Sequence, residues 1–257
     1  GLAGWWLLGS GSNLSAGLAG PAAGPAASLG ASLPASLAAS LSASAAVGLL
    51  VAWAAVAFVL VAGANAFNMC DNSDGLAAGT GTIALLGVFC LRSAAGGPDG
   101  VAWLSLTAAG ALIGFLYWNR PPARVYLGDA GTLPMGALVA WGLITIPGGA
   151  RWEVFVALPL TAGYLLFDPL LAVQGRLARR RAPWRGGVDH PAHDLRPVLG
   201  GWPAAWAMIL AAQLFSAALA VAVALRLVSP VWALLGLAPW VALAGAVVAG
   251  RRLRMDR

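Results

Sequence analysis

The chain has 257 residues, of which 60% are apolar and only 9% are charged. A mean hydropathy of +0.82 excludes an ordinary soluble globular protein and indicates an integral membrane protein. The formal net charge is +6, from 15 basic and nine acidic residues, and every basic residue apart from the two histidines is an arginine. The placement of these arginines in loops follows a membrane topology, so we expect no nucleic-acid partner.

Residues 1–45 differ in composition from the rest of the chain. They are mostly Ala, Ser, Gly, Leu and Pro, and no charged residue precedes Asp71. One span can be drawn over residues 2–18, but the prolines between residues 21 and 34 argue against a second one. Because the chain starts with Gly and its first Met is Met69, we expect a missing natural N-terminus. We therefore treat 1–45 as a low-complexity segment, non-native or a single span, and 46–257 as one membrane domain.

Seven later segments are apolar over approximately the 20 residues that a helix needs to cross a bilayer. They lie near residues 45–65, 77–92, 101–118, 131–149, 153–174, 203–225 and 230–250. The expected fold class is an all-α, polytopic transmembrane bundle of about seven or eight spans.

The arginines orient these spans. Twelve of the 15 fall in alternate connections or in the C-terminal tail, and only Arg92, Arg151 and Arg226 fall in the opposite set. Arginine-rich loops of membrane proteins lie predominantly in the cytoplasm. The three polar loops, near 65–76, 119–130 and 175–202, and the C-terminus are therefore predicted to be cytoplasmic.

The first polar loop carries the block N-A-F-N-M-C-D-N-S-D-G-L-A, from Asn65 to Ala77. It follows a long uncharged apolar run, and it holds two of the nine acidic residues, Asp71 and Asp74. Polar and charged groups at the end of a spanning helix are costly, and they indicate a functional site. Two carboxylates so close together are typical of cation binding, of a cation-bridged phosphate, or of proton transfer.

The second polar loop reads N-R-P-P-A-R-V-Y-L-G-D-A-G-T-L-P-M-G, from Asn119 to Gly136. Gly128 and Gly131 flank Asp129 and permit tight turns, and Thr132 could cap the following helix. A carboxylate beside a helix N-terminus can hold a metal ion that itself holds a phosphate. A capped turn without function is the alternative interpretation.

The third polar loop holds both histidines of the chain, His190 and His193, bracketed by Asp189 and Asp194. Arginines with two histidines suit a diphosphate better than they suit zinc. A positive-inside anchor with incidental histidines is the alternative. Asp168 is the remaining acid inside a span; we expect it to pair with a loop arginine or the polar cluster, or to have a structural role at a kink by Pro169.

These motifs resemble those of the polyprenyl-phosphate N-acetylhexosamine-1-phosphate transferases (glycosyltransferase family 4). The family pattern N-A-x-N-L-x-D-G-x-D-G-L-A is similar to Asn65–Ala77, with Asn72 in place of the usual Gly. The pattern N-x-x-P-A-x-V-[FY]-x-G-D-x-G-[ST]-L is similar to Asn119–Leu133, and Asp168 with Arg176 resembles a third. The sequence H-P-A-H-D only partly matches the family's run of two or three histidines.

The resemblance implies transfer of an N-acetylhexosamine phosphate from a UDP-sugar to polyprenyl phosphate at the cytoplasmic face of the bacterial inner membrane, in cell-envelope glycan synthesis. It implies Mg²⁺, with Mn²⁺ as the alternative cation, and a homodimer is compatible with it. The histidine pattern favours UDP-N-acetylglucosamine over UDP-N-acetylmuramoyl-pentapeptide as donor. The residue roles carried over are a catalytic group, a nucleotide-binding group and one metal ligand: catalytic Asp71, Asp74, Asp129, His190 and His193; nucleotide-binding Asn68, Asp74, Asn119 and Tyr126, with Tyr126 stacked on uracil; and Asp129 for the metal.

One feature of the family is absent. Its members carry an acidic pair, D-D-x-x-[DK], in an earlier cytoplasmic loop, whereas residues 1–70 contain no acid. We therefore expect the 257-residue chain to bind a uridine nucleotide with little or no turnover. Two alternatives remain: a truncated or inactive member that binds lipid or nucleotide, and an ion-coupled transporter that uses Asp71, Asp74 and Asp168 as a relay.

Overall fold

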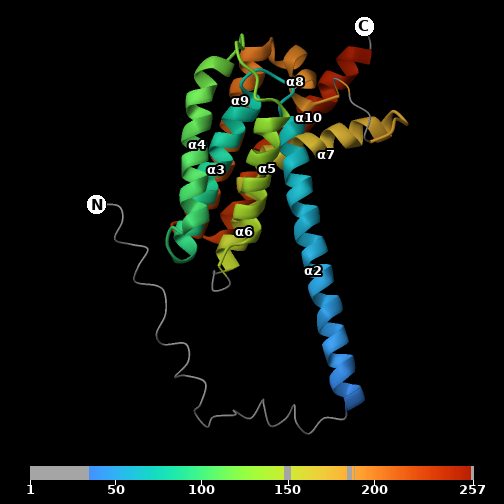
Figure 1. Cartoon of the computed structure of the whole chain (residues 1–257). Coiled ribbons are helices and arrows are strands. Elements are labelled where there is room, and N and C mark those ends of the chain that lie inside the picture. The colour runs from blue at the N-terminus through green and yellow to red at the C-terminus, as the bar shows by residue number, and fades with distance from the viewer. Residues whose placement is uncertain (1–34, 148–151, 184–186, 188, 256–257) are drawn as a thin grey trace. The chain divides into compact units, whose positions relative to one another are not determined.

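The structure, a computed structural model, describes residues 35–147, 152–183, 187 and 189–255 (Figure 1). The possible span over residues 2–18 lies outside this range. The chain divides into two units, residues 1–54 and 55–257. The described part of the first unit is helical, and all three polar loops lie in the second unit.

The regular elements among the described residues are all helices, joined by turns and loops, and these residues include no strand. The elements in chain order are α2 (Ala35–Cys70), α3 (Leu76–Gly96), α4 (Gly100–Asn119), α5 (Gly128–Ile144), α6 (Trp152–Thr161), α7 (Gly163–Ala178), α8 (Pro191–Leu199), α9 (Trp202–Ala224), the 3₁₀ turn η1 (Pro230–Trp232) and α10 (Ala233–Met255).

In this range five helices are long and apolar enough to cross a membrane, or six segments if the bent pair α6–α7 counts as one. The polytopic bundle is confirmed, but seven or eight spans are not found in this range. The segment predicted over 131–149 corresponds to α5, which has 17 residues and is shorter than a standard span. The segment predicted as one span over 153–174 is two helices that differ in direction by 55°.

Helix α3 lies at the centre of the bundle and packs against α4, α5, α6 and α9. Small residues let its neighbours approach closely: a Cβ on Gly81 would lie 2.5 Å from the Phe67 ring, and one on Gly87 would lie 2.6 Å from Thr161. Membrane helices associate by such close packing because lipid offers little hydrophobic drive between helices.

The break between α6 and α7 is held by a side chain from α9. The Gln213 side-chain amide donates to the Thr161 carbonyl at 2.9 Å, and its oxygen accepts from the Tyr164 N–H at 2.7 Å. Gln213 is completely buried. Helix ends leave backbone groups without intrahelical partners, and an inserted side chain is a recognised cause of a sharp bend. The bend between α6 and α7 therefore lies at Ala162, whereas Pro169, where the sequence suggested a kink, lies inside α7.

At the end of the bundle away from the polar loops, Arg92 of α3 is buried and pairs with Asp99. Its Nη1 also donates to the Gly142 carbonyl at 2.9 Å and to Thr145 Oγ1 at 3.2 Å, both at the end of α5. Asp99 caps α4 by accepting from the Ala102 N–H. The hydrogen bonds from Arg92 hold the pKa of the Asp99 carboxyl well below its ordinary value.

Candidate functional site

The first two polar motifs meet at the end of α2. This helix continues to Cys70, so Asn65 and Asn68 are helical, and the loop itself begins at Asp71. Asn68 Nδ2 donates to Asp129 Oδ1 at 2.7 Å and to Thr132 Oγ1 at 2.8 Å. Asp129 lies in the first turn of α5, as predicted, but Thr132 lies within this helix and binds Asn68 instead of acting as its cap.

The loop between α2 and α3 is also joined to the loop after α4. Asp74 Oδ2 accepts from the Ala123 N–H at 2.9 Å, and the Gly75 N–H donates to Asn119 Oδ1 at 3.0 Å. Asn119 is buried, and its Nδ2 donates to the Val125 carbonyl at 2.8 Å. Gly75 has φ +73°, a left-handed conformation that side-chain-bearing residues rarely adopt. Asn119 therefore fixes the shape of both loops.

The third loop joins the same site through Asp168. Its carboxylate is completely buried and lies 2.8 Å from His190 Nδ1. Asp168 Oδ1 also accepts from the Tyr164 hydroxyl at 3.0 Å and from Asn72 Nδ2 at 3.3 Å. The partners of Asp168 are thus a histidine and the polar cluster, and not a loop arginine. When Nδ1 donates to this carboxylate, Nε2 is left for a ligand.

Other members of the third loop have separate partners. His193 lies edge-on to Trp202, with ring centroids 5.1 Å apart. Asp189 pairs with Arg179 and lies 3.9 Å from Arg176 Nε. Among the described residues, the ion-pair partner of Asp168 is His190, and Arg176 forms no ion pair with Asp168. Tyr126 is 72% exposed. Its stacking on a base stays a prediction.

The acidic side chains of the described residues are unequally compensated by basic partners. Five acids have a basic partner: Asp99, Glu153, Asp168, Asp189 and Asp194. Asp71, Asp74 and Asp129 form no ion pair with any described residue. Burial, and then the neighbouring Asp74 carboxylate, raise the pKa of Asp71. Uncompensated negative charge is therefore concentrated in the two motifs that converge at Asn68.

Carboxylates without a basic partner are the kind of donor that a divalent cation takes. Mg²⁺ prefers oxygen ligands and is usually held by one or two carboxylates together with waters and substrate phosphates. Within the described residues no group of three or more His, Cys, Asp or Glu side chains is arranged to hold a metal ion by itself. The donor set thus suits Mg²⁺ shared with a phosphate-bearing substrate, and it does not suit a structural zinc site.

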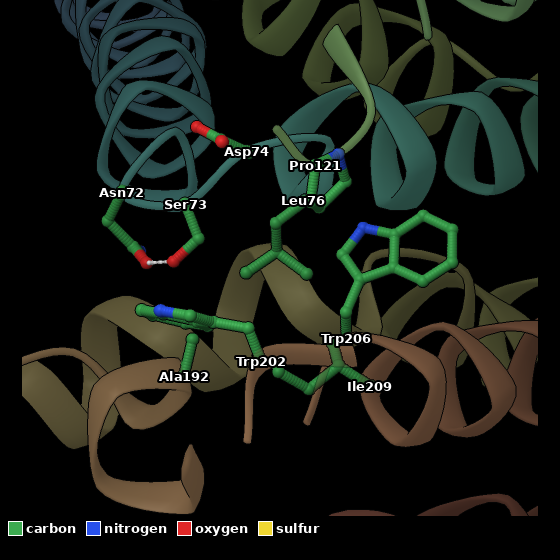
Figure 2. Close-up of a pocket in the computed structure, with 9 residues that line it drawn as sticks. All are labelled: Asn72, Ser73, Asp74, Leu76, Pro121, Ala192, Trp202, Trp206 and Ile209. Carbon is green, nitrogen blue, oxygen red and sulfur yellow. Dashed lines mark hydrogen bonds between the residues drawn. The ribbon is translucent and has the colours of Figure 1, made fainter. Parts of the chain in front are cut away.

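A cavity of about 210 Å³ adjoins these loops (Figure 2). Asn72, Ser73 and Asp74 line one side, and Trp202 and Trp206 of α9 line another. Ala192, between the two histidines, is also part of its wall. The volume is below the roughly 300–1,000 Å³ of a pocket that encloses a drug-sized ligand, so this cavity can enclose only a part of a ligand of that size.

A second, apolar groove of about 410 Å³ lies between α2, α5 and α7. Its lining is almost entirely aliphatic: Val59, Ala62, Gly63, Ala66, Gly136, Val139, Ala140, Leu143, Ile144, Ala162, Leu165, Leu166, Pro169 and Leu170. A Cβ on Gly136 would overlap the Gly63 carbonyl oxygen, so α2 and α5 touch backbone to backbone there. The groove begins two residues from Asn68, which places an apolar channel beside the polar site.

All three loops that the sequence predicted on one face meet at this site, but several of its side chains were not predicted. Tyr164 and Asn72, which bind Asp168, and Arg251, which binds Asp194, were not considered as site residues. Gln213 had a detectable signal, because an amide in the middle of an apolar span is costly unless it is bonded. Tyr164 and Arg251 had none, since an aromatic residue in a span and an arginine in a cytoplasmic tail are both ordinary.

Residues 12–147 match Glycosyl transferase family 4. The chain is 38% identical over 173 residues to a protein named phospho-N-acetylmuramoyl-pentapeptide-transferase from Synechococcus sp. strain RCC307, covering 61% of this chain and 43% of that protein. A protein of the same name from Synechococcus sp. strain CC9311 is 44% identical over 160 residues, 59% of this chain and 41% of that protein. A third protein of this name, from Picosynechococcus sp., is 44% identical over 105 residues, which cover 37% of this chain and 28% of that protein. The chain thus spans less than half the length of these relatives.

Proposed function

The chain belongs to glycosyl transferase family 4, and on that premise we propose that it transfers an N-acetylhexosamine phosphate from a UDP-sugar to polyprenyl phosphate at the cytoplasmic membrane surface. The observation that carries this proposal is the charge pattern of the site. The only described acids without a basic partner are Asp71, Asp74 and Asp129, and they lie in the two loops that Asn68 and Asn119 join.

In the proposed reaction an oxygen of the lipid phosphate attacks the β-phosphorus of the UDP-sugar. The bond from that phosphorus to the bridging oxygen breaks, the electron pair stays on this oxygen, and UMP leaves. The products are a polyprenyl-diphospho-sugar and UMP, and no oxidant or reductant is needed. Such displacements depend mainly on positioning and on stabilisation of negative charge.

Asp129, with Asp71 or Asp74, would hold Mg²⁺, which neutralises charge on the diphosphate when it is bound. Asn68 positions Asp129 through its 2.7 Å hydrogen bond. Asp168 holds His190 by Nδ1, so that Nε2–H of the ring, when protonated, can donate to a phosphate oxygen. Asn119 fixes the loop after α4 and the turn at Gly75 through its hydrogen bonds. Tyr126, exposed in the loop after α4, would stack on the uracil ring. His193, next to the cavity wall at Ala192, would contact the diphosphate or sugar.

The apolar groove between α2, α5 and α7 would receive the polyprenyl chain. Its aliphatic lining excludes water and offers no hydrogen-bonding groups to a hydrocarbon. Because it begins next to Asn68, a lipid lying in it would present its phosphate at the carboxylates. The lipid and the UDP-sugar would thus approach the site from the membrane and from the cytoplasm, respectively.

The donor is proposed to be UDP-N-acetylmuramoyl-pentapeptide, because the relatives are named for this transfer. UDP-N-acetylglucosamine is the second candidate, favoured only by the spacing of His190 and His193. The test is incubation of the protein, reconstituted with undecaprenyl phosphate and Mg²⁺, with each labelled donor. The lack of an acid in residues 1–70 predicts little turnover by these 257 residues. Any product should be UMP and a lipid-diphospho-sugar, formed faster from the pentapeptide donor.

The products separate the alternatives. Faster turnover of UDP-N-acetylglucosamine would reverse the donor assignment and retain the reaction. Release of UDP instead of UMP would show transfer of a sugar without its phosphate, and would contradict the proposed reaction. Mg²⁺-dependent binding of either donor without any product would support the nucleotide-binding, non-catalytic alternative.

A further inference from the structure

Arg251, near the C-terminal end of α10, contacts two other helices through one guanidinium group. Its Nε donates to Asp194 Oδ2 of α8 at 2.9 Å, and its Nη2 donates to the Leu171 carbonyl of α7 at 2.7 Å. Its Nη1 donates to Gln174 Oε1, also on α7, at 3.2 Å. The Asp194 side chain is completely buried. One side chain therefore ties α7, α8 and α10 together.

The two helices that Arg251 joins carry the Asp168–His190 pair. Leu171 follows Asp168 by three residues on α7, and Asp194 follows His190 by four residues at the start of α8. Each contact of Arg251 is thus about one helical turn from one member of the pair. Arg251 itself touches neither Asp168 nor His190 in any contact that the structure describes.

Two glycines make this approach possible. A Cβ on Gly175 would lie 2.9 Å from the Arg251 guanidinium carbon, and a Cβ on Gly250 would overlap the Asp194 carbonyl oxygen. The arginine lies flat on the surface of α7 only because Gly175 has no side chain. The backbones of α10 and α8 are similarly close only because residue 250 is a glycine.

We propose that Arg251 is a positioning residue for His190. Removal of Arg251 would take its hydrogen bonds away from the buried Asp194 carboxylate and from the Leu171 carbonyl at once. Helices α8 and α7 would then no longer be tied to α10 and could shift. Such a movement would carry His190, which immediately precedes α8, away from Asp168. The role assigned to His190 rests on the proposed function, whereas the mechanical link from Arg251 to His190 does not.

The test is a nitrogen-15 histidine spectrum of the protein in membrane nanodiscs. The chain contains only two histidines, so His193→Asn assigns the two sets of signals. In the wild type, His190 should show a hydrogen-bonded Nδ1–H. Arg251→Met should lose this signature, and Arg251→Lys should restore it in part. The neighbouring exposed Arg252 provides the matched control, because Arg252→Met should leave the spectrum unchanged.

Gly175→Ala is the second variant, since it displaces the guanidinium without removing any charge. It should change the His190 signals in the same direction, and it decides the question if Arg251→Met fails to fold. Wild-type His190 signals in every folded variant of Arg251 and in Gly175→Ala would overturn the proposal. Altered His190 signals in a protein that transfers no phosphosugar would contradict the proposed function and support the positioning role.

Discussion

Asp71 and Asp168 are both aspartates of the site, but the groups around Asp168 stabilise its carboxylate whereas those around Asp71 destabilise its charged form. Asp168 is buried, but His190, Tyr164 and Asn72 all contact its carboxylate. Asp71 has no such partner among the described residues; burial and the like charge of Asp74 act on it instead. A buried polar group with bonded partners stabilises a unique structure, whereas a like-charge pair destabilises it until a cation binds.

We predict that Asp71→Asn stabilises the cation-free protein at neutral pH. The pKa of Asp71 is higher in the folded state, so its ionisation costs stability at pH 7. This cost disappears as the pH falls below the unfolded-chain pKa of about 3.9. Thermal unfolding in detergent without Mg²⁺ should therefore show a higher midpoint for Asp71→Asn than for the wild type at pH 7. The two proteins should converge near that lower pH.

Asp189→Asn is the matched control, because Asp189 lies at the same end of the molecule but pairs with Arg179. It should lower the midpoint at pH 7. A lowered midpoint for Asp71→Asn as well would mean that Asp71 has a stabilising cationic partner, and would contradict the interpretation of its raised pKa.

At the scale of elements, the α6–α7 pair shows what a sequence pattern does and does not reveal. Hydropathy continues without interruption over 153–174, so one straight span was the natural prediction. The bend depends on Gln213, which is about 50 residues away in sequence and binds backbone groups on both sides of Ala162. Local patterns cannot specify a partner at that distance. By contrast, the starts of α3, α4 and α9 lie within one residue of the predicted starts, and Gly75, Asp99 and Pro203 mark them locally.

We predict that Gln213→Leu destabilises the protein, because it leaves the Thr161 carbonyl and the Tyr164 N–H without partners inside the bundle. Unsatisfied buried groups cost about 1–3 kcal/mol each. Unfolding in mixed micelles should show a loss of this size. Gln213→Glu keeps the acceptor for Tyr164 and supplies a donor to Thr161 only when it is protonated, so its loss of stability should grow as the pH rises. A leucine variant as stable as the wild type would show that the clamp by Gln213 is dispensable.

At the scale of the whole molecule, the meeting of three loops at one end was predictable, but the hydrogen bonds that join the loops were not. The number of spans between loops and the arginine distribution placed the loops on one side, and the contacts of Asn68, Asp74 and Asp168 confirm a shared end. The bonds themselves depend on rotamers and on the packing of helices far apart in sequence. Which side of the membrane this end faces stays a prediction from the positive-inside rule.

We predict that the polar end is cytoplasmic. In a background without Cys70 and Cys90, a cysteine introduced at Arg179 or Arg254 should react with a membrane-impermeant reagent only from the cytoplasmic side. A cysteine introduced at Gly97, in the connection between α3 and α4 at the other end, should react only from outside. Labelling of positions 97 and 179 from the same side would overturn the arrangement of spans, and the common face of the three loops with it.

The central claim is that Asp71, Asp74 and Asp129 form a Mg²⁺-dependent site for a UDP-sugar, with Asp129 as the principal ligand. Calorimetric titration of the protein with UDP-N-acetylmuramoyl-pentapeptide, with and without Mg²⁺, tests it most directly. Wild type should bind at least about tenfold more tightly with Mg²⁺, a difference of roughly 1.4 kcal/mol. Asp129→Asn should lose this gain in affinity, and any rate of transfer should be lower by about 10²-fold in this variant. The ion-paired control Asp189→Asn should keep the gain in affinity. An Asp129→Asn variant that retains the full Mg²⁺ effect would contradict the claim.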